Sequence, residues 1–208
     1  MILIGQYDSS FVRRVGIALT LYGIPFEHRP WSVFGDAERI AELNPLTRVP
    51  TMVLDDGTVL VDSFSMIDHI DGLVPAEARM FAPDGPERMR QMRLAALACG
   101  LADKGVALFY EQRLHAQVSE SWVQRCRGQI ARTLAALEAE RAAATSLYLF
   151  GEAIGHADIA LACALRHVGE SHPDLIDWQR HAALGAHCAR LEALSVFRDV
   201  SQPFIPPA

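Results

Sequence analysis

Short apolar runs alternate with stretches of helical periodicity over the first 73 residues. Good capping residues at 8–10 precede the first helical stretch, Gly23 follows it, and a turn at 55–57 joins two β-branched runs. The pattern predicts the order β-α-β-α-β-β-α, which is typical of an α/β fold with βαβ units. The predicted strands are 2–4, 26–29, 50–54 and 58–61, and the predicted helices are 11–22, 36–43 and 64–73.

From about Glu87 onward every periodic segment fits about 3.6 residues per turn, so this part is predicted to be all helical. Three prolines and one glycine between residues 74 and 86 mark a linker. We expect a domain at 1–74, a linker at 75–86 and an all-helical domain at 87–208. The expected helices are 87–116, interrupted or kinked near Gly100 and Gly105, then 119–143, 156–170 and 174–194; residues 203–207 form a non-helical tail across a surface.

The composition supports a folded protein without a nucleic-acid partner. The 208 residues are 50% hydrophobic with a mean hydropathy of +0.13, which is enough to bury a core. The formal charge of -6 disfavours binding to phosphate backbones or anionic membranes. Asp8, Arg13 and Arg14 interrupt the apolar start too early for a signal peptide, and no run approaches the roughly 20 apolar residues of a membrane span. A soluble cytoplasmic protein is expected.

Cysteine and histidine spacings give little support to a redox or metal centre. The cysteines include no C-x-x-C pair, so they are predicted to be buried and reduced within helices. No two histidines stand four apart, and His156 and Asp158, two apart on a predicted helix, do not face each other. The sequence therefore predicts no metal site. The four cysteines are Cys99, Cys126, Cys163 and Cys188.

The candidate chemistry lies where elements begin and end in the first 74 residues. No G-x-S-x-G, G-x-G-x-x-G or P-loop motif occurs, which argues against most hydrolases and nucleotide enzymes. What remains is Ser9 before the first helix, the Val49-Pro50 step before a strand, and the pair Asp62-Ser63 before the third helix. Because helix N-termini present unpaired N–H groups, these three points could together hold one small anionic molecule.

Three segments carry a family resemblance: YDSSFVRR at 7–14, NPLTRVPT at 44–51 and DS at 62–63. In this order, ahead of an all-helical half, they resemble the cytosolic glutathione S-transferases, and among them a bacterial serine-type member. The resemblance covers nearly the whole chain. It implies a thioredoxin-like domain that binds glutathione as co-substrate, a helical domain that supplies an electrophile pocket, and a homodimer with no metal.

The resemblance also implies roles for particular residues. Ser9 would donate its hydroxyl to the glutathione sulfur. Val49, ahead of a cis Pro50, would offer its backbone to the cysteinyl unit as one strand adds to another. Asp62 and Ser63 would hold the γ-glutamyl end. The remaining candidates are Arg48 and Trp31 along the path of the tripeptide, and Phe11, Tyr110 and Arg113 in the electrophile pocket.

One hydroxyl at this place is enough for the chemistry. A thiol with a pKa near 8.5 is only a few per cent ionised at neutral pH, and lowering that pKa by about two units takes roughly 2.7 kcal/mol. A hydroxyl that donates to an anion supplies about 1.5–3 kcal/mol, and a helix N-terminus adds roughly 0.3–1 kcal/mol. Tyr7 and Ser10 are alternatives for this donor, and Ser9 also suits a plain N-cap role.

Two further motifs are interpreted as structural. Arg13 and Arg14 are predicted to lie on a solvated helix face, with pairing of one of them to an acid across the domain interface as the alternative. Ile154, Gly155 and Asp158 resemble the hydrophobic staple and capping box at the buried central helix of this family, with glycine in place of the usual serine or threonine.

The expected function is conjugation of glutathione to a small, largely apolar electrophile. One alternative is a non-catalytic relative that uses the same fold to bind partners or ligands. A glutathione-dependent thiol reductase would need a cysteine near the first helix, and residues 7–14 contain none. Isomerases of maleyl-type acids also have paired serines, but carry beside them a cysteine that this chain lacks.

Overall fold

A four-stranded mixed sheet organises the N-terminal part of the computed structural model, which describes residues 1–206. The strands lie in the order β2-β1-β3-β4; β1 and β2 run parallel, and β3 is antiparallel to both of its neighbours. In this register Leu3 pairs with His28 on one side and Met52 on the other. The strands are β1 (Ile2–Ile4), β2 (Glu27–Arg29), β3 (Thr51–Val53) and β4 (Val59–Val61).

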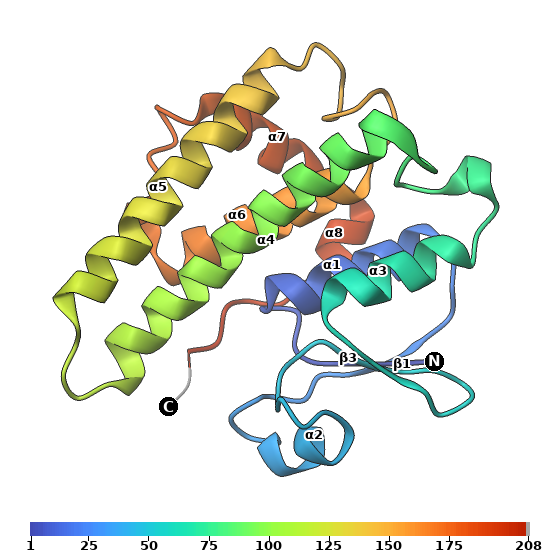
Figure 1. The fold of residues 1–208 in the computed structure, drawn as a ribbon, viewed down its shortest axis with the longest axis horizontal. Helices are drawn as coiled ribbons and strands as arrows, with labels where there is room; N and C mark the ends of the chain where they lie inside the picture. Colours follow the sequence, from blue (N-terminus) through green and yellow to red (C-terminus); the bar gives the residue numbers. More distant parts are fainter. Residues whose placement is uncertain (207–208) are drawn as a thin grey trace. The chain divides into compact units, whose positions relative to one another are not determined.

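Three helices alternate with the strands along the chain. α1 (Ser10–Leu21) follows β1, α2 (Ala37–Leu43) follows β2, and α3 (Ser63–Gly72) follows β4. α1 and α3 pack against each other on one side of the sheet, and α2 lies on the other side (Figure 1). The predicted element order and the thioredoxin-like α/β fold are confirmed. The core between α1, α3 and the sheet includes the buried side chains of Leu3, Val12, Val15, Leu19, Met52, Ile67 and Ile70.

The helical unit, Asp84–Ala193, is built around α6 (His156–Ser171). Every residue from His156 to Leu165 is buried, because α4 and α7 pack on α6. Asp158 accepts the backbone N–H of Gly155 at 2.9 Å, so the predicted capping interaction at the start of α6 is confirmed. The all-helical prediction is also confirmed; the other elements are α4 (Gly85–Leu114), α5 (Glu120–Ala143), the short 3-10 helix η2 (Pro173–Leu175) and α7 (Ala182–Glu192).

The predicted interruption of the first long helix is wrong, since α4 continues through both glycines. Gly105 instead allows α6 to approach closely: a Cβ there would lie 3.0 Å from Val168 Cγ2. Its carbonyl oxygen lies 2.9 Å from Nε2 of His172, whose pKa is lowered by burial. The glycine therefore serves helix packing rather than a break.

The prediction of one helix over 174–194 is also wrong, because α7 begins only at Ala182. The Asp177 carboxylate accepts the backbone N–H groups of Gln179 and Arg180 at 3.0 and 3.3 Å, and this makes a turn. The Trp178 ring packs over Gly185, where an added Cβ would lie 3.3 Å from Cε3. Side-chain packing thus overrides helical periodicity here.

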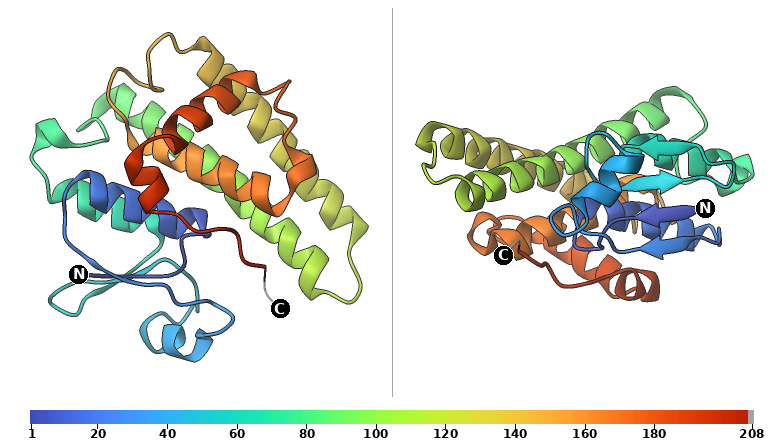
Figure 2. Two further views of the ribbon diagram at one scale, coloured as in Figure 1. Left: turned by 180° about the vertical axis from the view of Figure 1, so that it is seen from behind. Right: turned by 90° about the horizontal axis from the view of Figure 1, so that it is seen from below.

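The chain from Leu194 onward belongs with the N-terminal unit. This unit comprises Met1–Pro83 and the C-terminal segment, whereas the expected helical domain ran to the end of the chain. α8 (Ser195–Asp199) packs against α1, and the segment after it runs past the start of α1 (Figure 2). Residues 203–206 are not helical, as predicted; residue 207 lies outside the described part. The predicted linker contains the 3-10 helix η1 (Ala76–Ala78).

All four cysteines are free thiols in helices; Cys99, Cys126 and Cys163 are buried and Cys188 is half-buried. In residues 1–206 no helix combines the length and apolar character needed to cross a membrane. Within the same residues, no three histidine, cysteine or acidic side chains gather as they would around a metal ion.

Candidate functional site

Ser9 is the N-cap of α1 and lies half-buried between β1 and the helix. Its Oγ accepts a long hydrogen bond, 3.4 Å, from the backbone N–H of Val12. A serine oxygen that accepts one bond still carries its proton, and this proton meets no acceptor among residues 1–206. Ser9 can therefore cap its helix and donate to a ligand at the same time.

Tyr7, the first alternative donor, packs away from the start of α1. Its ring stacks on His28, with the centroids 3.9 Å apart. A Cβ on Gly16 would lie 3.2 Å from the Tyr7 hydroxyl oxygen, and Gly16 is roughly 10 Å along the helix from Ser9. Burial raises the pKa of Tyr7 to about 12, so the phenol is neutral at neutral pH. These contacts favour a packing role.

Ser10, the second alternative, is only 5% exposed. Its Oγ has no hydrogen-bond partner in the part of the chain that the structure describes. The two neighbouring serines therefore differ in burial: Ser10 is buried, and Ser9 is half-buried.

Asn44 shapes the loop that leads to β3. This side chain is 1% exposed, and its Nδ2 donates to the Arg48 carbonyl oxygen and to Thr51 Oγ1, both at 3.0 Å. Its Oδ1 accepts the backbone N–H of Leu46 at 3.0 Å. Three bonds from one buried amide fix the course of the loop, because leaving any of them unmade would cost about 1–3 kcal/mol.

Val49 stands near the end of this loop and next to the first turn of α1. The Val49–Pro50 peptide bond is cis, as the resemblance implied. The backbone N–H and C=O of Val49 make no hydrogen bond within residues 1–206. Both groups are therefore available to a peptide that lies alongside as an additional strand.

Gly5 allows Val49 to approach α1. Its φ is +129°, which L side chains rarely adopt, and an added Cβ would lie 2.5 Å from Val12 Cγ2 and 2.8 Å from Val49 Cβ. We expect Gly5→Ala to lower the free energy of unfolding by about 1–3 kcal/mol, because backbone strain and overpacking combine. Urea unfolding followed by circular dichroism measures this loss.

The matched control for this change is Gly57→Ala. Gly57 also has a positive φ, +86°, but an added Cβ would meet nothing within 4 Å. It is expected to lose less stability than Gly5→Ala. Equal losses in the two variants would show that the contact with Val12 and Val49 is unimportant.

Asp62 and Ser63 begin α3. Asp62 has a φ of 72°, and its exposed carboxylate accepts the backbone N–H of Phe64 at 2.7 Å. The backbone N–H groups of Ser63 and Ser65 have no partner among the described residues. Free N–H groups at the positive end of a helix suit a carboxylate, and the neighbouring Asp62 carboxylate suits an ammonium group.

Arg13 and Arg14 are 2% and 1% exposed, so the predicted solvated face is wrong. Arg14 Nη1 donates to Ser63 Oγ at 3.3 Å, and its guanidinium lies 4.6 Å from the Phe64 ring centroid. Arg14 thus ties α1 to the start of α3. Because Ser63 accepts this bond, its own hydroxyl proton remains for another acceptor.

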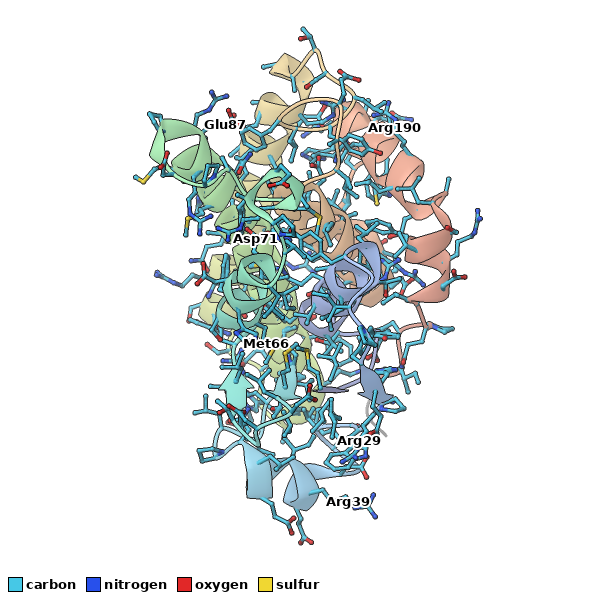
Figure 3. All side chains as sticks on the ribbon, turned by 90° about the vertical axis from the view of Figure 1, so that its right-hand side faces the viewer. Arg29, Arg39, Met66, Asp71, Glu87 and Arg190 are labelled. Carbon is cyan, nitrogen blue, oxygen red and sulfur yellow. The ribbon has the colours of Figure 1, made fainter. Side chains whose placement is uncertain are left out.

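Trp31 lies half-buried between two arginines. The guanidinium carbons of Arg29 and Arg39 are 5.7 and 5.9 Å from its ring centroid, and both arginines lie toward one end of the N-terminal unit (Figure 3). Each arginine also has a carboxylate partner, Glu27 for Arg29 at 2.7 Å and Asp36 for Arg39 at 3.3 Å. No hydrogen bond within residues 1–206 joins Trp31 to Ser9 or Val49.

The candidates for an electrophile pocket fall in both units. Phe11 is half-buried in the first turn of α1. Tyr110 and Arg113 are exposed on α4, and the Arg113 guanidinium lies 5.9 Å from the Phe109 ring centroid. That these three line one pocket stays a prediction.

Three of the predicted points gather along the first half of α1: Ser9 caps it, Val49 and Val12 of α1 both lie next to Gly5, and Ser63 bonds to Arg14. Arg48 contributes its carbonyl oxygen to the Asn44 loop, and its side chain is exposed. The sequence interpretation missed the positioning roles of Asn44 and Arg14. The Asn-Pro step after a helix could have indicated the first, whereas Arg14 bonds to a residue 49 positions away and leaves no local signal.

The thioredoxin-like unit therefore presents a serine hydroxyl at a helix start, an unpaired backbone beside a cis-proline and a capped helix with free N–H groups. Comparison with known families agrees with this fold. The family model described as "Glutathione S-transferase, N-terminal domain" matches residues 3–78, and the corresponding C-terminal domain matches residues 120–190.

The chain is 35% identical over 169 residues to YibF, a GST-like protein of Escherichia coli K12, covering 81% of this chain and 82% of that protein. It is 28% identical to a maleylacetoacetate isomerase of Pseudomonas aeruginosa over 100% of both chains. A solved glutathione S-transferase from Methylobacterium radiotolerans, in complex with glutathione sulfonate, matches with a TM-score of 0.88 and 27% identity over 100% of this chain and 98% of that one. The chain belongs to the glutathione S-transferase family.

Proposed function

We propose that the protein is a glutathione transferase, which conjugates glutathione to a small, largely apolar electrophile and acts as a cytoplasmic homodimer. The observation that carries this proposal is the half-buried Ser9 hydroxyl, whose proton has no acceptor within residues 1–206. Val49 would bind the cysteinyl unit, and Asp62 and Ser63 would hold the γ-glutamyl end. Trp31 and Arg48 would line the path of the tripeptide.

Ser9 would act by stabilising the thiolate of bound glutathione. A donated hydroxyl bond and the N-terminus of α1 together supply about 2–4 kcal/mol in favour of the anion, which is enough to move the thiol pKa below neutral pH. The thiol proton leaves to solvent. The sulfur then attacks an electrophilic carbon, a C–S bond forms, and the bond to the leaving group breaks with its electron pair.

Two measurements with the full chain test this proposal. The protein is expected to be retained on immobilised glutathione and released by free glutathione. It is also expected to turn over an aryl halide with one thiol consumed and one halide released for each product. Retention without turnover would favour a non-catalytic binding protein, and the absence of both would contradict the proposed site.

The variant Tyr7→Phe tests whether the Tyr7 phenol or the Ser9 alcohol donates to the glutathione sulfur. Since the Tyr7 ring packs on His28 and beside Gly16, the variant is expected to keep turnover close to that of the wild type. Steady-state kinetics with glutathione and an aryl halide measure this. A large loss of kcat in Tyr7→Phe would transfer the thiol-binding role from Ser9 to Tyr7.

The maleylacetoacetate isomerase relatives and the Ser9-Ser10 pair favour a second candidate, glutathione-dependent isomerisation of a maleyl-type acid. Such isomerases carry a cysteine beside their paired serines, whereas in this chain Phe11 follows Ser10. The two reactions differ in their use of glutathione, because isomerisation returns the thiol after each turnover and conjugation consumes it. Titration of free thiol during turnover of each substrate distinguishes them.

A further inference from the structure

The C-terminal segment is anchored to α1 by a buried arginine. Arg13 Nε donates to the Val200 carbonyl oxygen at 2.9 Å, and Nη2 donates to the Phe197 carbonyl oxygen at 2.7 Å. The guanidinium carbon also lies 5.4 Å from the Phe197 ring centroid. A buried charge is costly unless it is hydrogen-bonded, so these contacts fix the position of the chain up to Val200.

Beyond Val200 the segment contacts the turn that precedes Ser9. The backbone N–H of Tyr7 donates to Gln202 Oε1 at 3.0 Å, and the backbone N–H of Ile205 donates to Asp8 Oδ2 at 3.2 Å. Within the turn, the Ser9 N–H donates to the Gln6 carbonyl oxygen at 3.2 Å. The views agree that the C-terminal trace passes the N-terminal end of α1 (Figures 1 and 2).

We propose that residues 201–206 are a positioning element of the glutathione site, which holds the turn at 6–9 and through it the Ser9 hydroxyl. This inference rests on the proposed function. The segment does not touch the sulfur in this scheme; it limits the positions that Ser9 can adopt. Placement matters because an error of about 1 Å in a reacting group can cost a factor on the order of a hundred in rate.

Two variants test the segment without removing its anchor. A chain that ends at Ser201 keeps both peptide carbonyl groups that Arg13 binds and loses the contacts of Gln202 and Ile205. Gln202→Ala removes the acceptor for the Tyr7 N–H and leaves the backbone of the segment in place. The matched control is Gln179→Ala, an exposed glutamine in the helical unit.

The measurements are kcat, KM for glutathione, and the pH dependence of kcat/KM with an aryl halide. Both test variants are expected to lose kcat, on the order of tenfold for the truncated chain, with a smaller change in KM. The pH profile is expected to shift upward, because a less well placed hydroxyl stabilises the thiolate less. A purely structural role would lower the melting temperature and leave the pH profile of the folded enzyme unchanged.

The outcomes separate this inference from the proposed function. Wild-type protein that neither binds glutathione nor turns over substrate contradicts the proposed function itself. Active wild type, together with a truncated chain or Gln202→Ala that keeps the wild-type kcat and pH profile, overturns the positioning role alone. If the truncated chain does not fold, Gln202→Ala still decides the question through its pH profile.

Discussion

Ser9→Ala is expected to lower kcat with an aryl halide by about tenfold to a hundredfold, with little change in the dissociation constant of glutathione. The reason is that the hydroxyl acts on the charged sulfur, whereas most of the binding would come from the backbone of Val49 and the start of α3. Steady-state kinetics and calorimetric titration with glutathione measure the two quantities. The ultraviolet absorbance of bound thiolate gives a third, and it is expected to appear only at higher pH in the variant.

Ser10→Ala is the control for this change. It removes the same group one residue along the chain, but from a side chain that is 5% exposed. We expect its turnover to remain near that of the wild type. If Ser10→Ala lost activity and Ser9→Ala did not, the thiol-binding role would belong to Ser10. Wild-type thiolate absorbance in Ser9→Ala would contradict the proposed mechanism directly.

The parts of the fold that local sequence determines were predictable. The order of strands and helices in the first 73 residues follows from capping residues and from periodicity within single elements. The region around Trp178 was not predictable in this way. Its turn depends on the Asp177 carboxylate and on the packing of the Trp178 indole over Gly185, which lies in the next helix, α7. A periodic apolar pattern contains no information about that packing.

In the candidate site, too, the residues with local contacts were predictable and those with distant contacts were not. Ser9 and Asp62 are N-caps, and a cap is visible in sequence because its side chain bonds to its own helix. The cis state of Val49–Pro50 was implied by the family resemblance alone. The contact of Gln202 with Tyr7 spans 195 positions and has no local signal. Sequence therefore indicated the groups that would touch glutathione and missed those that hold them.

Asp158→Ala is expected to have the largest effect on stability. The side chain is 1% exposed; Oδ1 accepts the Leu149 N–H and Oδ2 accepts the Gly155 N–H, both at 2.9 Å. His187 Nε2 lies 3.1 Å from Oδ1. Removal of the carboxylate leaves the N–H groups of Leu149 and Gly155 unsatisfied. We therefore expect a loss of about 3–5 kcal/mol in the free energy of unfolding. Scanning calorimetry is expected to show a melting temperature lower by roughly 10 °C.

Two further variants identify the cause of that loss. Asp158→Asn keeps one acceptor oxygen and is expected to fall between alanine and wild type, because one of the two N–H groups still finds a partner. Asp174→Ala, at an exposed position of the helical unit, is expected to melt like the wild type. A wild-type melting temperature in Asp158→Ala would contradict the capping role.

Asp158 lies in the unit that contains none of the residues proposed to bind glutathione. Folded Asp158→Ala is therefore expected to bind glutathione normally at low temperature. Loss of stability without loss of affinity would therefore separate what folds the helical unit from what binds the tripeptide.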